Sequence, residues 1–420
     1  MSEELLYFVW KFGLTNPNLQ TVNGENISVI SSGTQNHLSG PDFTNAKIRI
    51  GDKQWYGNVE IHVKSSDWIK HGHSSDRSYD SIILHVVYEN DVDLDEHIFR
   101  KVPTVELKQN IDTSFLENYE RFSKQKGWIT CESQINQIDE FHISSWLERL
   151  RVERLERKTD AIQHLLESNQ GDWETSFIIW ICTAYGFKFN TTPFELLAKK
   201  LSPKMLVNSK NLEALLLGLS GLLPTFSNDF YVNELISEFE YYRAKWKSEP
   251  MESSIWKTGG VRPPNQPVVR IVQLAGLLSK CTGGFWSTIV GLESIDELKE
   301  YVQVKPNEYW STHYNFGAST KVHEPGISDA SFGLIVINCI VPFLFTYGKS
   351  QNKEALVQRA FSLQDYVDPE SNRIINNWKE LGLKPANAGQ SQALLELFNE
   401  YCLRKKCLIC SIGNKLLRND

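Results

Sequence analysis

The hydrophobic pattern of this 420-residue chain changes its period partway along, and this change constrains the fold more than any other feature. Before residue 110, short apolar segments alternate with polar residues and are separated by turn signals such as NGE, GDKQ and ENDVD, which is typical of strands. After about residue 140, apolar residues recur at helical spacing. The sequence therefore predicts an α+β chain with an α/β domain over 1–110, a connection over 111–140 and one or more predominantly α-helical domains over 141–420.

The N-terminal part predicts one helix followed by a set of strands. SEELLYFVWKF has an acidic first turn and apolar residues at helical spacing. The strand-like segments that follow are 25–33, 42–50, 55–63, 81–89 and 102–108.

Two segments of the helical part need separate interpretation. RLRVERLERK (149–158) interleaves basic residues with glutamates, which predicts a solvated, salt-bridged helix face. ASFGLIVINCIVPFLFTYG (330–348) approaches the length of a membrane span, but Asn338, Pro342 and its shortness favour a buried core helix.

Composition narrows the class of protein. Apolar residues make up 41% and charged residues 23% of the chain, and the net charge is −7, so any contact with nucleic acid would need a local patch. The seven cysteines are an odd number, and the N-terminus lacks the basic region of a signal peptide. We therefore expect a cytoplasmic protein with free thiols and no membrane partner.

The segment GPDFTNAKIRIGDKQWYGNVEIHVKSSDW (40–68) predicts a metal site on a hairpin. Side chains alternate along a strand, so Glu60, His62 and Lys64 share one face. Two strands and a tight turn bring Asp42 back beside Glu60. Carboxylates are ligands for Mg²⁺ or Mn²⁺, and His62 could act as a base or a ligand. In the alternative, Asp42 caps a turn and the strand residues form an exposed face with cross-strand partners.

Six of the ten histidines fall in the N-terminal part, namely His37, His62, His71, His73, His85 and His97. In HGHSSD, His71 and His73 could ligate Zn²⁺ with Asp76 as a third ligand or orienting group. The alternative is a polar loop whose side chains bond to the backbone. His85 lies in an apolar strand and is either a core histidine or a neighbour of Glu60 and His62.

The tail YCLRKKCLIC places Cys402, Cys407 and Cys410 at a C-x4-C-x2-C spacing. Three thiolates and a fourth ligand could bind Zn²⁺ or an iron–sulfur cluster. No fourth ligand is apparent nearby, although Cys281 or Cys339 could supply it, and packing between helices is the alternative.

Arg262 in VRPPNQPVVR sits beside two prolines and could anchor an anion or cap the helix that starts near Pro267. The chain contains no Walker-type loop, no Rossmann fingerprint and no G-x-S-x-G motif.

The pattern of Pro41-Asp42, a strand-turn-strand gap, and Glu60-x-His62 resembles the PD-(D/E)xK nuclease superfamily. The resemblance covers residues 1 to 110 and implies a mixed sheet with flanking helices. It implies that Asp42 and Glu60 hold the metal and that Glu3 or Glu4 is an acid on the first helix. His62 stands where the superfamily has a Lys that positions or activates the attacking water.

Most of the chain also resembles a bacterial family without an assigned activity, domain-of-unknown-function family 2851. The segments that carry this resemblance are GPDFTNAKI, GNVEIHVKSSDW, HGHSSDRSY, IILHVVYE, GGVRPPNQPVVRIVQLAGLL and YCLRKKCLICSIGNKLL.

Three functions are therefore considered. The first is a Mg²⁺- or Mn²⁺-dependent phosphodiesterase or nuclease that uses Asp42, Glu60 and His62. The second is a catalytically inactive nuclease-like fold that serves as an interaction module. The third is a Zn²⁺-dependent hydrolase built on HGHSSD.

Overall fold

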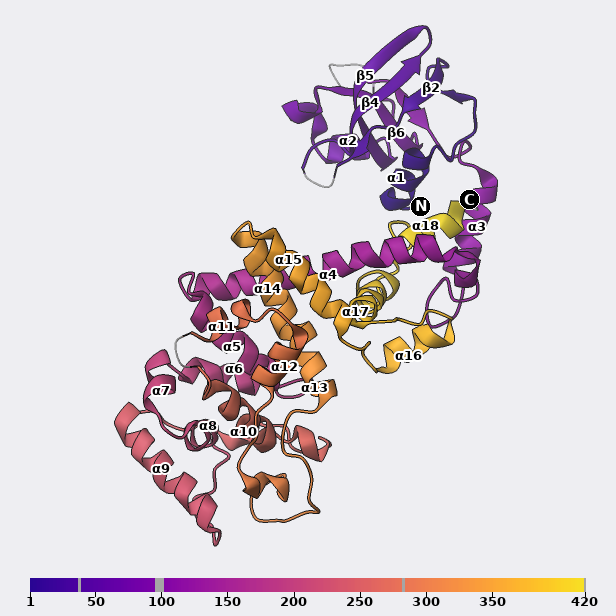
Figure 1. Ribbon diagram of the computed structural model, residues 1–420. Helices are drawn as coiled ribbons and strands as arrows, with labels where there is room; N and C mark the ends of the chain where they lie inside the picture. The colour runs from indigo at the N-terminus through magenta and orange to yellow at the C-terminus, as the bar shows by residue number, and fades with distance from the viewer. Residues whose placement is uncertain (37–38, 95–101, 282–283, 419–420) are drawn as a thin grey trace. The chain divides into compact units, whose positions relative to one another are not determined.

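The computed structural model describes residues 1–420 except 37–38, 95–101, 282–283 and 419–420. The chain forms two compact units (Figure 1). Unit 1 contains Met1–Trp146 and Phe398–Asp420, and unit 2 contains Leu147–Leu397. The boundaries differ from the expected division into 1–110, 111–140 and 141–420, because the C-terminal segment joins the N-terminal part.

Unit 1 is built on a mixed sheet, which confirms the predicted α+β class. Within the described residues the strand order is β1-β2-β4-β5-β6-β7, and β3 pairs with β4. Neighbouring strands are antiparallel from β1 to β5, whereas β5–β6 and β6–β7 are parallel. The strands are β1 (Leu19–Gln20), β2 (Asn26–Ser31), β3 (Thr34–Gln35), β4 (Phe43–Ile50), β5 (Lys53–Lys64), β6 (Ile82–Glu89) and β7 (Thr104–Glu106).

Local sequence explains the first helix and the central hairpin. The side chain of Ser2 caps α1 (Glu3–Phe12), and Gly13 ends it in the left-handed conformation. Gly51 and Asp52 form the two-residue connection between β4 and β5, where Gly51 has φ 55°. α1 packs against β5 with an apolar face that includes Leu6 and Val9.

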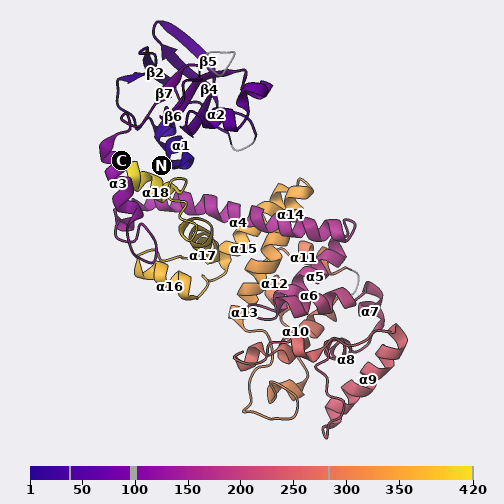
Figure 2. The ribbon, with the colours of Figure 1, turned by 180° about the vertical axis from the view of Figure 1, so that it is seen from behind.

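Short helices and the C-terminal segment complete unit 1. α2 (Asp67–Lys70), η1 (His73–Ser75) and η2 (Arg77–Tyr79) connect β5 to β6, while α3 (Thr113–Ser123) and η4 (Ile135–Gln137) follow the sheet. The C-terminal helix α18 (Ser411–Arg418) lies beside α3 in both views (Figure 1, Figure 2). The side-chain amide of Asn118 donates to the carbonyl of Leu417 (3.1 Å), and Trp128 stacks on Phe398.

Unit 2 is helical over its described residues, as predicted. The unit boundary falls inside α4 (Glu140–Ser168). The other helices are α5 (Trp173–Tyr185), α6 (Thr191–Lys200), α7 (Pro203–Asn208), α8 (Leu212–Leu219), α9 (Phe230–Trp246), α10 (Pro267–Leu278), α11 (Phe285–Gly291), α12 (Ile295–Val302), α13 (Asp329–Ile335), α14 (Val341–Ser350), α15 (Glu354–Tyr366), α16 (Arg373–Glu380) and α17 (Ala388–Glu396). A π-helical segment (Val336–Ile340) joins α13 to α14, and a second one (Leu397–Cys402) follows α17.

The predicted solvated, salt-bridged face over 149–158 holds for only part of this segment of α4. Arg149 is exposed and forms an i,i+4 ion pair with Glu153 (2.9 Å), as predicted. Arg151 is instead buried, and its Nε donates to Gln364 Oε1 (2.6 Å). Arg154 and Arg157 both form ion pairs with the buried Glu396 of α17. Three of the basic side chains therefore have partners on other helices of unit 2, which periodicity alone does not reveal.

One helical stretch in the described part of the chain, Asp329–Ser350, is long and apolar enough to cross a membrane, by length and composition only. Its most apolar window has a mean hydropathy of 1.9, and 72% of that window is buried inside the protein. This burial agrees with the expected core helix.

A glycine permits the close pairing of β5 with β6. A Cβ at Gly57 would lie 2.4 Å from Ile83 Cγ2 and 2.6 Å from the carbonyl oxygen of Ser81. We expect Gly57→Ala to destabilise unit 1 by about 1–3 kcal/mol, because the two strands must separate. Hydrogen–deuterium exchange tests this prediction: backbone amides of β5 and β6 should exchange faster in Gly57→Ala than in wild type. The control is Gly259→Ala in unit 2, where a Cβ meets nothing within 4 Å, and equal exchange in both variants would contradict the prediction.

Candidate metal centre in unit 1

The middle strand β5 carries a carboxylate and an imidazole that are both buried. Glu60 is 4% exposed and His62 is 2% exposed, and they alternate with the apolar Val59 and Ile61. This burial differs from the exposed strand face that was the alternative interpretation of the sequence. A buried carboxylate needs polar partners, because its desolvation otherwise costs several kcal/mol, roughly.

The antiparallel neighbour β4 brings Asp42 to Glu60, as the hairpin geometry predicts. The backbone N–H of Asp42 donates to Glu60 Oε2 (3.2 Å), and Asp42 Oδ2 accepts from the backbone N–H of Ile61 (2.9 Å). Asp42 Oδ1 accepts from the hydroxyl of Tyr7 on α1 (2.9 Å). Both oxygens of Asp42 therefore accept hydrogen bonds from protein donors, and its backbone orients the carboxylate of Glu60.

The connection after β5 brings two further imidazoles to His62. His71 Nδ1 lies 3.2 Å and His73 Nε2 lies 3.3 Å from His62 Nε2. His73 Nε2 is also 3.2 Å from Glu60 Oε1, and His62 Nε2 is 3.6 Å from the same oxygen. The hairpin acid and the HGHSSD histidines, which the sequence presented as rival sites, thus lie together.

We call His62, His71 and His73 the histidine group. Their potential ligand atoms all lie within 4.8 Å of one another, so the three side chains could hold one metal ion. Four ligands at 2.0–2.1 Å around a tetrahedral zinc are roughly 3.3 Å apart. The distances from His62 Nε2 to His71 Nδ1 (3.2 Å) and to His73 Nε2 (3.3 Å) match this spacing, so the residues fit a divalent transition metal.

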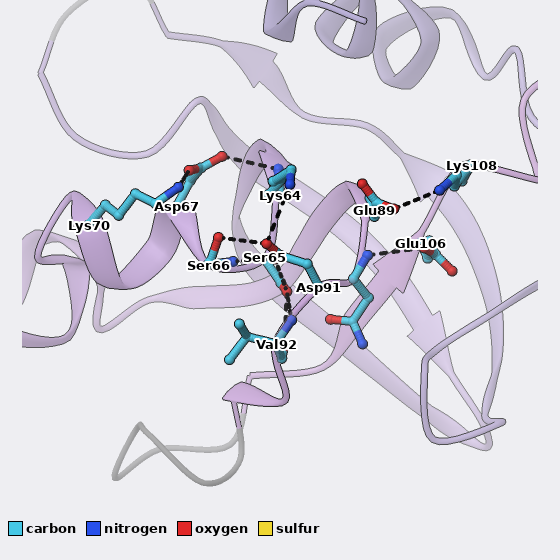
Figure 3. Close-up of polar contacts among 11 residues, drawn as sticks. Lys64, Ser65, Ser66, Asp67, Lys70, Glu89, Asp91, Val92, Glu106 and Lys108 are labelled. Atoms are coloured by element: carbon cyan, nitrogen blue, oxygen red, sulfur yellow. Dashed lines mark hydrogen bonds and ion pairs between the residues drawn. The ribbon is translucent and has the colours of Figure 1, made fainter.

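A polar network fixes the turn that delivers His71 and His73 (Figure 3). Asp91, which follows β6, accepts from the backbone N–H and the hydroxyl of Ser66 (2.9 Å each). Ser65 Oγ accepts from the backbone N–H of Val92 (2.9 Å), and Asp67 accepts from that of Lys64 (3.1 Å). These bonds tie the end of β6 to the start of α2, which sets the direction in which α2 and η1 leave the sheet.

The parallel neighbour β6 places His85 behind His62. His85 pairs in register with Glu60, is fully buried, and has its Nε2 2.8 Å from His62 Nδ1. This contact holds the ring of His62 with Nε2 directed at the other two histidines. His85 Nδ1 is buried and lacks a hydrogen-bond partner in the described part of the protein.

Burial dominates the electrostatics of the site. It raises the pKa of Glu60 to about 8, with a further rise from the neighbouring Asp42, and it raises the pKa of Asp42 to about 6. Burial, together with His73 and His71, lowers the pKa of His62 to about 3. At neutral pH His62 is therefore a neutral imidazole with a lone pair available, which is the form that binds metals.

Other candidate residues lie outside this arrangement. Glu4 is exposed, and the neighbouring Glu3 is the acid of α1 that interacts electrostatically with Asp42 and Glu60. Lys64 lies 3.8 Å from Asp91, and Asp76 accepts from the backbone N–H of Ser78.

The remaining residues predicted from the sequence lie in other parts of the chain. Arg262 is exposed in unit 2 at the start of a short 3-10 helix (Pro263–Asn265), not of α10. Cys402, Cys407 and Cys410 line a separate pocket of unit 1. His37 and His97 lie outside the described residues.

Sequence reasoning did not identify Tyr7. The available signal was its position four residues after Glu3, which places both side chains on the same face of α1. It also missed Tyr79, whose ring lies against that of His73 with a centroid distance of 3.9 Å.

A family model described as "Protein of unknown function (DUF2851)" matches residues 3–373. The chain belongs to this family. The match confirms the expected membership and includes all residues of the histidine group, while the family's description assigns no activity. No curated protein and no solved structure matches the chain. The likeness to PD-(D/E)xK nucleases stays a prediction.

The raised pKa of Glu60 has a measurable consequence for the metal-free protein. Folded Glu60 holds its proton up to about pH 8, whereas the ordinary value is 4.5, so its contribution to stability is lost as the pH rises through 8. The lowered pKa of His62 makes the folded state more stable as the pH rises, but only below pH 6.5, where the unfolded histidine is protonated. Between pH 6.5 and 8 we expect Glu60→Gln to gain at least about 3 °C in Tm relative to wild type.

Thermal melts with a chelator present measure this difference at each pH. Glu4→Gln, which neutralises an exposed acid of α1, is the control and should follow wild type. If the difference in Tm between Glu60→Gln and wild type stays constant from pH 6.5 to 8, the pKa of Glu60 is not raised as stated.

Proposed function

We propose that the chain is a metal-dependent hydrolase of phosphodiesters whose metal is a zinc-type divalent ion held by His62, His71 and His73. The convergence of three imidazole nitrogens beside Glu60 carries this proposal. Nitrogen donors favour zinc and related transition metals over Mg²⁺, which prefers oxygen ligands. Three histidines with one open position are a known arrangement of catalytic zinc sites.

A bound divalent ion of this kind lowers the pKa of water and stabilises charge that develops on a phosphate. The positive charge of the ion would also lower the pKa of the neighbouring Glu60, so that its carboxylate can take the proton of the attacking water at Oε1. The backbone N–H of Asp42 holds Glu60 Oε2, so Oε1 remains directed at His73 and His62. His85 accepts the Nδ1 proton of His62, which leaves His62 Nε2 free to bind.

The phosphodiester substrate rests on the resemblance to the nuclease superfamily. Asp42 precedes β4, Glu60 and His62 lie on β5, and α1 packs against β5, in the order that the resemblance implies. His62 replaces the expected Lys, and here it belongs to the histidine group. Because the chain carries a net charge of −7, a nucleic-acid substrate would bind through a local patch.

A second candidate is a Mg²⁺ or Mn²⁺ site on Asp42 and Glu60. The observation that favours it is the pairing of these two acids, with Glu3 nearby on α1. Against it, both oxygens of Asp42 accept hydrogen bonds from Tyr7 and Ile61. A catalytically inactive interaction module is the remaining alternative.

Metal titration by calorimetry separates these candidates. We expect wild type to bind Zn²⁺ with one site at the histidine group, and His73→Ala to lose more affinity than His85→Gln. The His85→Gln variant should bind Zn²⁺ with an affinity roughly 10- to 100-fold lower than wild type, because His85 orients His62 without binding the metal itself. His164→Ala, which changes an exposed histidine of α4, is the control and should bind like wild type. Binding of Mn²⁺ that depends on Asp42 but not on His73 would support the second candidate instead.

Activity is measured separately on a chromogenic phosphodiester, single-stranded DNA and RNA. We expect Glu60→Gln to bind the metal yet to lose about 10²–10⁴-fold in rate, because its proton acceptor is gone. Metal binding at the histidine group without hydrolysis of any of these substrates would favour the interaction module.

A further inference from the structure

Four cysteines from two distant parts of the sequence line one pocket in unit 1. Cys131 follows α3, whereas Cys402, Cys407 and Cys410 lie between α17 and α18. All four are free thiols. Cys131 was not among the fourth ligands considered from the sequence, and the two that were, Cys281 and Cys339, belong to unit 2.

The backbone holds these cysteines in a close-fitting loop. A Cβ at Gly413 would lie 2.4 Å from the carbonyl oxygen of Cys407, so only glycine permits this approach. The backbone N–H of Cys410 donates to the carbonyl of Lys406 (3.0 Å), and that of Lys406 donates to Tyr401 (2.9 Å). The pocket is therefore formed by hydrogen-bonded turns rather than by a continuous amphipathic helix, which was the alternative interpretation of the tail.

Electrostatic interactions link the four thiols. Burial holds the pKa of Cys402 well above its usual range, and the neighbouring Cys410, Cys131 and Cys407 raise it further. A negative charge on one sulfur is therefore disfavoured by the other three thiols.

Burial acts against that charge when no cation is present. It raises the pKa of Cys131 to about 12 and that of Cys410 to about 11, so the isolated thiols stay protonated at neutral pH. A bound metal ion would stabilise the thiolates despite their burial, because its positive charge replaces that of the thiol protons.

The spacing of the sulfur atoms distinguishes between two kinds of centre. Thiolates at 2.3 Å around one tetrahedral zinc lie roughly 3.8 Å apart. Within the described residues, a search for three or more potential metal ligands within 4.8 Å of one another finds the histidine group and no group of these four cysteines. The four cysteines are thus spread more widely than a single zinc requires, as a centre of several metal ions needs.

We propose that Cys131, Cys402, Cys407 and Cys410 hold an iron–sulfur cluster of the [4Fe–4S] type. Binding replaces four S–H protons with four Fe–S bonds, and the iron and inorganic sulfide come from outside the protein. The cluster joins the segment before α4 to the segment after α17, so it closes the two ends of unit 1 between which the sequence of unit 2 is inserted. This site is independent of the histidine group and of the proposed hydrolase function.

The test is anaerobic purification of the full chain, followed by measurement of iron, acid-labile sulfide and zinc and by visible and paramagnetic resonance spectra. We expect about four iron and four sulfide per chain and a cluster signal on reduction. The iron content per chain of the Cys131→Ser variant should be at least about tenfold lower than that of wild type, because one of the four cluster ligands is removed. The control Cys281→Ser changes a partly exposed thiol of unit 2 and should keep the full iron content.

Spectra of the wild-type protein keep the proposal testable if Cys131→Ser fails to fold. A wild-type chain with neither iron nor a cluster signal, also after reconstitution with iron and sulfide, overturns the proposal. Stoichiometric zinc that is retained in His73→Ala and lost in Cys407→Ser also overturns it, in favour of a mononuclear zinc centre.

Discussion

Burial of Glu60 and His62 in the middle strand of the sheet is the constraint on which the arrangement of unit 1 depends. A carboxyl group removed from water needs polar partners, and each element around β5 contributes one. The antiparallel strand β4 brings the backbone N–H of Asp42, the parallel strand β6 brings His85, and the turn after β5 brings His73. The polar network around Asp91 holds this turn in place because it joins the ends of both parallel strands (Figure 3).

The two units treat buried charge in different ways. In unit 2, the buried Glu396 is neutralised by Arg154 and Arg157, so the charges balance within the protein. In unit 1, Glu60 contacts a backbone amide and two imidazoles that are neutral at pH 7, because burial lowers the pKa of both His62 and His73. Burial also raises the pKa of Glu60 to about 8, so the carboxyl group keeps its proton at pH 7 and the site is neutral without a metal. In the cysteine pocket burial likewise keeps the thiols protonated, because it raises the pKa of Cys131 and Cys410.

The two proposed centres differ in the softness and spacing of their ligands. The histidine group offers borderline nitrogen ligands about one zinc tetrahedron apart, whereas the cysteines offer soft sulfur ligands that are more widely separated. A single chain can therefore select a different metal at each site through geometry and ligand type. The description of the family assigns no activity. The proposed functions are therefore argued from the chemistry of these side chains.

The sequence by itself determined the class of the fold, the strands around Asp42 and Glu60, and their pairing, because a period-2 pattern and a two-residue turn act over short distances. It also indicated the helical character of residues beyond 140, although it misjudged the exposure of Arg151, whose partner Gln364 lies far along the chain. Only the tertiary structure decided that His71 and His73 meet His62, and that Cys131 joins the tail cysteines. The reason is physical: the direction of the turn after β5 and the return of the C-terminus to α3 depend on contacts between residues distant in sequence, and no local pattern encodes those contacts.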